Sequence, residues 1–207
     1  MDFVHPISAV IPGAQGRVLA ALAETTAELN LRTLARLSGV SVAQASRVLP
    51  GLVELGLVER REVPPSSQFR LVRTHVAARA VLQLAAARET VLAEIGAMAA
   101  TLEVPPASVI VFGSFARGDA GPQSDVDAVF VRPEGVGEDD DRWVDGVEQW
   151  RTTVRSLTGN AAEVLEVSIG EIAQRVHGHQ AIWHDIRRDG RVVHGLTLDV
   201  LESTAHA

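Results

Sequence analysis

Two aspartates, Asp125 and Asp127, lie one residue apart in the stretch VIVFGSFARGDAGPQSDVDAVFV, residues 109–131. Apolar runs flank a polar loop here, which predicts a strand, a loop and a second strand. Because side chains alternate along a strand, both acids share one face, where their charges repel each other. Carboxylate oxygens are ligands that Mg²⁺ prefers, and this ion often takes its other ligands from phosphates. The pair therefore predicts a metal site that faces a phosphorylated ligand.

Gly113 and Ser114 stand where the first of these apolar runs ends. Backbone amides and a hydroxyl in a tight turn form a cradle for an anion. With a phosphate cradle on one side and paired carboxylates on the other, the stretch predicts a site for a nucleoside triphosphate and Mg²⁺.

The segment GSFARGDAGPQSDVD, residues 113–127, resembles the nucleotidyltransferase signature of the DNA polymerase β superfamily. It is most similar to the minimal bacterial nucleotidyltransferases, and the match covers eight positions over fifteen residues. The resemblance implies that Asp125 and Asp127 bind two Mg²⁺ ions, and that Arg117 supports the loop or the triphosphate. It assigns nucleotide binding to four residues of the motif: Gly113, Ser114, Arg117 and Ser124.

The superfamily uses a third carboxylate on a neighbouring strand, and the segment NAAEVLEVS, residues 160–168, offers Glu163 and Glu166. If Leu165 and Val167 point into the core, Glu166 lies on the opposite face and Glu163 on the buried side. Glu166 is therefore the predicted third metal ligand and proton acceptor. Aspartate is the more usual residue in the family.

The resemblance implies an enzyme that moves a nucleoside monophosphate, with AMP expected, from a nucleoside triphosphate, with ATP expected, to a hydroxyl group. Such a reaction is of the EC 2.7.7 type. Related domains act on antibiotics, on nucleic-acid ends and on hydroxyls of partner proteins such as toxins, so the acceptor stays open. The alternative is a transcriptional regulator or antitoxin whose nucleotidyltransferase domain senses nucleotide or does not turn over.

The N-terminal half shows helical periodicity in residues 15–25 and again in residues 31–40. Asn30 is a predicted N-cap, and Ser41 is predicted to cap a third helix that ends at Gly56. Two strand-like runs, residues 57–63 and 68–72, follow and are joined by PPSS. This order resembles the winged helix-turn-helix domains of bacterial regulators.

That resemblance implies DNA contacts from the third helix and from the hairpin that follows it, called the wing. Pro50 is expected to kink the third helix, because it removes a backbone donor. Winged helices also serve as dimerisation or protein-docking modules, so a homodimer or a protein partner stays open. The implied contacts with DNA are Ala43, Gln44, Ser46 and Arg47 in the helix and Arg60, Arg61 and Arg70 in the wing.

The expected fold class is α+β, with the winged helix-turn-helix at residues 1–78 and a long connecting helix at 79–104. Residues 75–102 carry apolar positions at helical spacing without an internal proline. A nucleotidyltransferase domain is expected at residues 105–207, with a small mixed sheet and helices on one face.

Composition narrows the class of protein. The 207 residues are 46% hydrophobic and include no cysteine, which excludes a disulfide framework and a thiolate metal site. No apolar run approaches the ~18 to 20 residues of a membrane span, and the first residues lack the pattern of a signal peptide. These features predict a cytoplasmic protein without a membrane partner.

Charge divides unevenly along the chain. Residues 1–88 hold 10 Arg against 6 acidic residues, net +4, and residues 89–207 hold 9 Arg against 20, net −11. A basic half can approach a polyanion such as DNA, whereas an acidic half repels one unless metal ions intervene.

Two further charged segments are less informative. Residues 138–141, EDDD, precede a predicted helix and are interpreted as a solvated loop with acids near the helix N-terminus. His177, His179 and His184 lie in a segment with Gly178 and without cysteine. They are interpreted as a polar surface, in preference to a zinc site.

Overall fold

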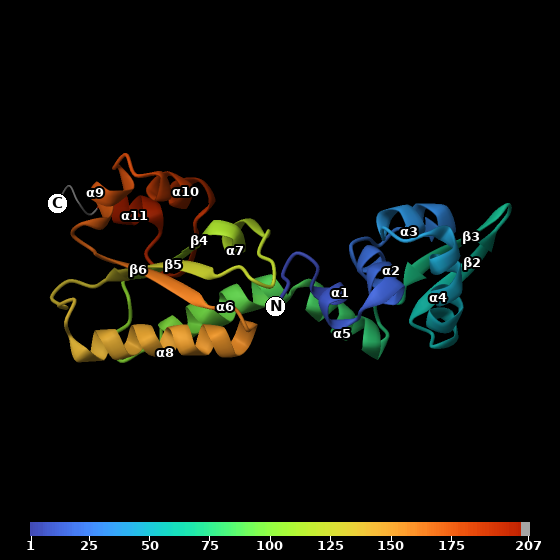
Figure 1. Ribbon diagram of the computed structural model, residues 1–207, viewed down its shortest axis with the longest axis horizontal. Helices are drawn as coiled ribbons and strands as arrows, with labels where there is room; N and C mark the ends of the chain where they lie inside the picture. The colour runs from blue at the N-terminus through green and yellow to red at the C-terminus, as the bar shows by residue number, and fades with distance from the viewer. Residues whose placement is uncertain (204–207) are drawn as a thin grey trace. The chain divides into compact units, whose positions relative to one another are not determined.

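The computed structural model describes residues 1–203 and folds into two compact units, each shown in Figure 1. The N-terminal unit consists of Asp2 and Val4–Ala87, and the C-terminal unit consists of Met1, Phe3 and the chain from Arg88 onward. Both units combine helices with a small sheet, so the predicted α+β class is confirmed. Within residues 1–203, no helix has the length and apolar character needed to cross a membrane.

The N-terminal unit is a helix-turn-helix followed by a β-hairpin. Its three strands pair antiparallel in the order β1-β3-β2. Its elements are α1 Pro6–Val10, α2 Gly13–Ala23, β1 Leu29–Asn30, α3 Leu31–Leu37, α4 Val42–Glu54, β2 Val58–Val63, β3 Ser66–Leu71 and α5 Val76–Ala85.

Local sequence signals set the helix starts in this unit. The Asn30 side chain accepts a hydrogen bond from the Thr33 amide, and Ser41 and Gln44 form a reciprocal capping box at the start of α4. Both predicted N-caps are thereby confirmed. Helix α4 includes Pro50 and continues to Glu54, and the kink expected at Pro50 stays a prediction.

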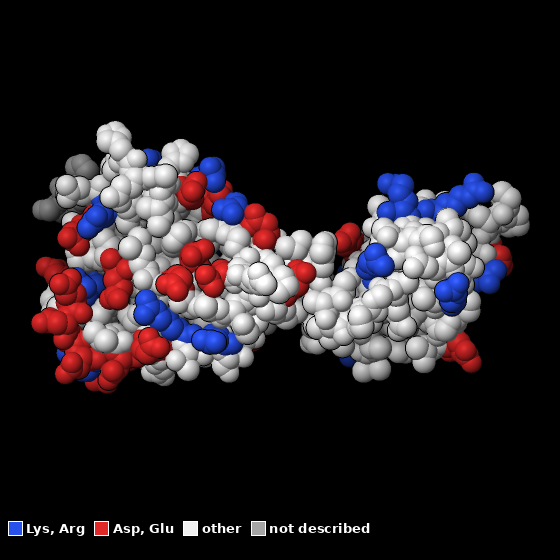
Figure 2. Space-filling view, viewed as in Figure 1, with Lys and Arg blue, Asp and Glu red and all other residues white. Residues whose placement is uncertain are grey.

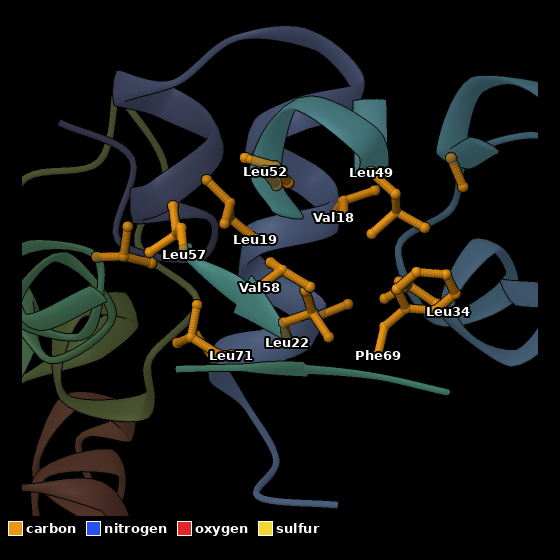
Figure 3. Packing of buried hydrophobic residues seen from close by; sticks show 14 of the residues in the cluster. Val18, Leu19, Leu22, Leu34, Leu49, Leu52, Leu57, Val58, Phe69 and Leu71 are labelled. Carbon is orange, nitrogen blue, oxygen red and sulfur yellow. The ribbon is translucent and has the colours of Figure 1, made fainter. Parts of the chain in front are cut away.

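A single apolar core holds the helices and the hairpin of this unit together (Figure 3). Leu22 from α2, Leu34 from α3 and Leu52 from α4 meet Val58 from β2 and Leu71 from β3. Each of these side chains is at most 5% exposed. Because one core joins the hairpin to the helices, the wing has a fixed place beside α4.

The C-terminal unit is built around a four-stranded mixed sheet with the order β6-β5-β4-β7. Strands β5 and β6 run parallel, and the other neighbouring pairs are antiparallel. Its elements are α6 Ala87–Ala99, β4 Ser108–Phe112, α7 Gly113–Arg117, β5 Val126–Arg132, α8 Asp141–Thr158, β6 Ala162–Ser168, α9 Ile172–Val176, α10 Ala181–Asp189, β7 Arg191–Gly195 and α11 Leu198–Ser203.

Helices cover both faces of this sheet, so the expectation of helices on one face was wrong. On one face, the Phe130 ring packs against Trp143 and Trp150 of α8, and Trp150 Nε1 donates to the Ile95 carbonyl of α6. On the other face, Val129 of β5 belongs to an apolar cluster with residues of α9, α10 and α11. A central strand buried on both faces loses the apolar–polar alternation that would show which face is covered.

The predicted connecting helix is not continuous. Helix α5 ends at Ala85 and α6 begins at Ala87, with Ala86 between them at φ −91° and ψ 7°. The two compact units divide at this point, between Ala87 and Arg88, rather than at the predicted limits of 78 and 105. Val81 packs in the core of the N-terminal unit, whereas Val91 is buried in the C-terminal unit, so one apolar stripe serves two cores. The last four residues of the predicted 105–207 domain lie outside the described residues.

Candidate active site

Three strand ends meet at one end of the sheet in the C-terminal unit. Strand β4 ends there and β5 and β6 begin there, because β4 is antiparallel to β5 while β5 and β6 are parallel. The register pairs Phe112 with Asp127, and Asp127 with Glu163. Gly113, which follows Phe112, therefore lies beside the first residues of β5, as the sequence predicted.

Gly113 is required by the carboxylate that lies against it. Its φ is +68°, and a Cβ added there would lie 2.5 Å from Asp127 Oδ2. A side chain at this position would both strain the backbone and displace the carboxylate. The glycine of the motif thus serves the close approach of Asp127 as well as the turn into α7.

The first turn of α7, at Gly113 and Ser114, is partly buried and begins beside Asp127. Its N-cap, Phe112, makes no side-chain hydrogen bond to the helix. The first amides of a helix have no partner within the helix, so those at the start of α7 can donate to an anionic oxygen. The anion cradle was predicted at these residues, Gly113 and Ser114, and anion binding there stays a prediction.

The Asp127 carboxyl lies in an electrostatically unfavourable place. Burial raises the pKa of the half-buried Asp127 carboxyl, and the neighbouring charges of Asp125 and Glu163 raise it further, while Arg117 opposes them. A divalent cation would relieve this repulsion, and the oxygen ligands present suit Mg²⁺. Across residues 1–203 no three His, Asp or Glu side chains form a ready-made metal group. The fit to a cation therefore rests on ligand chemistry and charge.

The third acid on this face is Glu163, and the prediction that Glu166 shares the face with the aspartates was wrong. Glu163 pairs directly with Asp127 in the parallel register and therefore points to the same side of the sheet. Glu166 pairs with Phe130 and lies on the side covered by α8. There its carboxylate accepts a hydrogen bond from Trp143 Nε1.

The prediction failed because the two faces of β6 are both partly covered. Val167 is buried as expected, but Leu165, on the same face, is 36% exposed. The face of β6 that carries Glu163 therefore changes along the strand. It is buried at Val167, near the end, and exposed to solvent at Glu163, near the start. Strand position would have been the better signal, since Glu163 and Asp127 are each the second residue of parallel neighbours.

A buried asparagine that the sequence pattern did not single out holds the loop before Asp125. Asn160 Nδ2 donates to the carbonyls of Ser124, at 2.7 Å, and Gly121, at 3.2 Å. The Ser124 hydroxyl closes the same loop by accepting from the Gly121 amide at 2.9 Å. Ser124 thus has a structural partner in the loop, and its predicted contact with nucleotide stays a prediction. The sequence signal that could have revealed Asn160 is a polar residue between the helix-ending Gly159 and the strand β6.

Two arginines, Arg88 and Arg117, make contacts at the C-terminal end of α7. Arg88 Nη1 donates to the Ala116 carbonyl at 2.9 Å, and a Cβ at Gly118 would lie 2.8 Å from the same atom. Arg117 bonds Asp119 at 3.3 Å and lies 3.9 Å from Asp189. Arg117 therefore has acidic partners here, and its charge also acts on Asp127, while its expected role toward the loop or the triphosphate stays a prediction.

The comparisons with known proteins agree with this geometry. Residues 99–175 match the family model of the nucleotidyltransferase domain. The C-terminal unit is a nucleotidyltransferase domain. Residues 16–62 match the IclR helix-turn-helix domain, which covers α2 through most of β2 in the N-terminal unit.

One solved structure with a distant likeness is described as "Crystal structure of the toxin-antitoxin with AMP-PNP". It aligns with 56% of this chain and 83% of its own. Its sequence identity is 12% and its TM-score is 0.38. No curated protein matches the chain.

The helix-turn-helix presents the predicted residues of α4 to solvent. Gln44, Ser46 and Arg47 are exposed on the recognition helix. Gln44 is partly engaged, because its side-chain oxygen accepts from the Ser41 amide. Arg47 makes no ion pair within residues 1–203, and its predicted contact with DNA stays a prediction.

The wing differs from α4 because glutamates neutralise its arginines. Arg60 pairs with Glu62, Arg61 with Glu28, and Arg70 with Glu59. The Arg60 and Arg70 pairs are solvent-exposed on both sides, so each contributes little to stability and is open to competition from a phosphate, whereas Glu28 is only 25% exposed. Figure 2 shows basic side chains over α3 and the hairpin of this unit. Those of α3, Arg32 and Arg36, have no acidic partner in the described chain.

The remaining charged segments of the nucleotidyltransferase domain have structural or surface roles. Asp140 is the N-cap of α8, where it accepts from the Arg142 amide and pairs with the Arg142 side chain, which lowers the pKa of Asp140. This confirms the interpretation of residues 138–141 as acids at a helix start. His177, His179 and His184 are exposed.

Proposed function

We propose that the C-terminal domain transfers a nucleoside monophosphate from a nucleoside triphosphate to a hydroxyl of an acceptor in a Mg²⁺-dependent reaction, with ATP the expected donor. The observation that carries this proposal is the meeting of Gly113, Asp127 and Glu163 at one end of the sheet. A family match alone gives the fold, whereas this juxtaposition supplies a phosphate cradle beside paired acids.

The residues of the site divide the work between them. The amides at the start of α7 and the Ser114 hydroxyl bind phosphate oxygens of the donor. Asp125, Asp127 and Glu163 are the carboxylates that would hold Mg²⁺. When bound, Mg²⁺ neutralises charge on the triphosphate.

The reaction exchanges one bond for another. The acceptor hydroxyl oxygen attacks the α-phosphorus and forms a new phosphorus–oxygen bond, while the bond from the α-phosphorus to the oxygen shared with the β-phosphate breaks. Pyrophosphate leaves with that electron pair. The proton of the hydroxyl passes to a carboxylate, and we assign this role to Glu163 in place of Glu166.

A label-transfer experiment tests the proposal. The protein is incubated with Mg²⁺ and ATP labelled at the α-phosphate or the γ-phosphate, together with a bacterial lysate as the source of acceptor. Label from the α-phosphate should enter a product while label from the γ-phosphate is released in pyrophosphate. The paired change Asp125→Asn/Asp127→Asn should abolish both signals.

The same experiment separates the enzyme from a nucleotide sensor. A sensor would be stabilised against heat by Mg²⁺ and ATP without releasing pyrophosphate in any lysate. A nucleotidyltransferase is stabilised by Mg²⁺ and ATP and also releases pyrophosphate. The Asp125→Asn/Asp127→Asn variant should show neither the stabilisation nor the release. Protein partners, including a toxin, are detected as labelled polypeptides, and nucleic-acid acceptors as labelled polynucleotides.

We further propose that the N-terminal unit binds DNA, with α4 in the major groove. The specific observation is the exposed Arg47 on α4 together with Arg32 and Arg36 on α3, none of which has an acidic partner among residues 1–203. DNA binding would bring the acidic nucleotidyltransferase domain to a chosen site. Titration of a DNA fragment library at several salt concentrations tests it, because phosphate contacts give a salt-dependent affinity.

A further inference from the structure

The first residues of the chain contribute to the C-terminal unit, although the helix-turn-helix follows them in sequence. Met1 and Phe3 group with the chain from Arg88 onward, whereas Val4 begins the continuous part of the N-terminal unit. Phe3 is only 6% exposed, so its ring is buried within the C-terminal unit. This segment lies far from the nucleotidyltransferase motif in sequence, and the motif gives no indication of it.

Phe3 contacts α7 and the loop after it with both its ring and its backbone. Its ring meets the Phe115 ring edge to face, with 4.8 Å between the centroids and 69° between the planes. Its amide donates to the Ala120 carbonyl at 3.0 Å. Phe115 and Ala120 are both fully buried, so Phe3 completes a packed region of this unit.

Asn160 joins the same segment to the same loop. The Met1 nitrogen donates to Asn160 Oδ1 at 2.5 Å. Asn160 Nδ2 in turn donates to the loop carbonyls of Gly121 and Ser124. The segment therefore holds the loop that leads to Asp125 at more than one point, directly through Phe3 and indirectly through Asn160.

A movement of Phe115 would move the start of α7 as well. The helix is only five residues long, and Phe115 lies two positions after Gly113 in it. A Cβ at Gly113 would lie 2.5 Å from Asp127 Oδ2, so α7 already approaches the acid closely. Removing the Phe3 ring would leave a cavity beside Phe115, into which α7 could shift and so withdraw from Asp127.

We infer that Phe3 is a positioning residue for the proposed reaction, because it fixes α7 and the loop before Asp125 in the arrangement that binds Mg²⁺ and nucleotide. The inference rests on the proposed nucleotidyl transfer and adds a residue that precedes the helix-turn-helix. Phe3 itself contacts neither nucleotide nor metal. A misplacement of about 1 Å in a site that works by positioning can cost about 10²-fold in rate, so a packing contact one side chain away is sufficient for this role.

Binding of Mg²⁺ and ATP to the full chain tests the inference without turnover. Phe3→Ala and Phe3→Leu are titrated by isothermal calorimetry, without an acceptor, at a temperature at which each variant is folded. We expect Phe3→Ala to weaken the affinity about tenfold. Phe3→Leu keeps most of the buried apolar volume and should bind within about threefold of the wild type. Val4→Ala, at the next residue, which is 43% exposed, is the matched control and should bind as the wild type does.

A purely structural role predicts a different result. A residue that only stabilises the fold does not change the affinity of molecules that remain folded. Wild-type affinity in folded Phe3→Ala would therefore overturn the inference. An equal loss of affinity in Val4→Ala would overturn it as well.

A second measurement on the wild-type protein does not depend on the folding of a Phe3 variant. Coupling between two sites is reciprocal, so bound Mg²⁺ and ATP should hold Phe3 in place more firmly. Hydrogen exchange of the Phe3 amide, which donates to the Ala120 carbonyl, should slow by about tenfold at saturation, the same factor as for affinity. The Asp125→Asn/Asp127→Asn variant should show no slowing. Unchanged exchange at Phe3 in the wild type with ligand bound would contradict the inference.

Failure of the proposed function would give another pattern. The wild type would then bind Mg²⁺ and ATP but release no pyrophosphate in any lysate, and the affinity of Phe3→Ala would still decide the positioning role. A wild type that binds no Mg²⁺ and ATP would overturn both. Where transfer takes place, Phe3→Ala should lower kcat/KM for ATP by about tenfold or more. Phe3→Leu should restore most of it, and an unchanged value in Phe3→Ala would contradict the inference.

Discussion

Asp127 is the residue at which the chemistry of this protein conflicts most with its stability. Its carboxylate is half-buried against Gly113, and Asp125 and Glu163 both act on it with like charge. Nothing in a purely structural role requires three acids there. Residues kept in an electrostatically unfavourable place are typical of functional sites.

Replacing Asp127 with Asn should stabilise the metal-free protein. The folded-state pKa of Asp127 is raised, so its ionisation in the folded chain costs free energy, and stability falls as pH rises through that raised value. At pH 7 in EDTA, Asp127→Asn should raise the unfolding midpoint by about 2 °C. The gain should disappear below the ordinary pKa of aspartate. Asp145→Asn, at an exposed site on α8, is the control, and an equal gain there would contradict the assignment.

The two glutamates of β6 should separate catalysis from stability. Glu163→Gln keeps the size but removes the charge and the proton acceptor, so nucleotidyl transfer should fall by about 10²-fold or more. Glu166→Gln should leave transfer unchanged and lower the free energy of unfolding by about 1 kcal/mol, because the charged acceptor of the Trp143 hydrogen bond is removed. Label transfer and denaturant unfolding measure the two effects. The reverse pattern would restore Glu166 as the third acid.

Among the elements, α7 and the loop before β5 matter most for the proposed reaction. Arg88 caps the carbonyl end of α7, and Asn160 holds the loop carbonyls of Gly121 and Ser124. Both residues lie outside the motif. They keep the phosphate cradle and the acids at fixed positions, which is the support that a site based on positioning requires.

In the N-terminal unit, α3 and α4 rather than the wing should carry the main phosphate contacts. Arg32→Ala/Arg36→Ala should weaken DNA binding and reduce the salt slope by about one unit for each phosphate that the protein no longer binds. Arg60→Ala/Arg61→Ala should have a smaller effect, because both side chains must first leave their glutamate partners. Mobility-shift titrations across salt concentrations measure the slopes. A larger effect from the wing pair would show that the glutamates release their arginines on DNA.

At the scale of the whole molecule, two units with separate cores divide at Ala87 and carry opposite net charge. The basic unit suits a polyanion, while the acidic unit suits metal ions and a small nucleotide. The division of charge along the chain therefore matches the division of proposed functions.

Separate cores should give separate responses to ligand. In calorimetry of the full chain, Mg²⁺ with ATP should raise one transition, that of the C-terminal unit, and leave the other in place. The Asp125→Asn/Asp127→Asn variant should show no such shift. A single transition that moves as a whole would instead indicate that the two units unfold cooperatively.

Local sequence patterns were sufficient to predict the capped helices of the N-terminal unit and the approach of Gly113 to the acids of β5. Capping residues, helical periodicity and the spacing from Gly113 to Asp127 are local properties, and local backbone geometry follows from them. Asn30 and Ser41 cap the predicted helices, and Gly113 lies against Asp127 as the motif implied.

Contacts between distant parts of the chain fix which glutamate lies on the face of the aspartates and which arginines have an acidic partner. The choice between Glu163 and Glu166 depends on the register of β6 against β5 and on helices that cover both faces of the sheet. Arg61 is neutralised by Glu28, which lies 33 positions earlier in the chain. Such contacts join residues that are distant in sequence, so no local pattern contains them. When both faces of a sheet are covered, strand alternation does not show which side chains point to the face of the site.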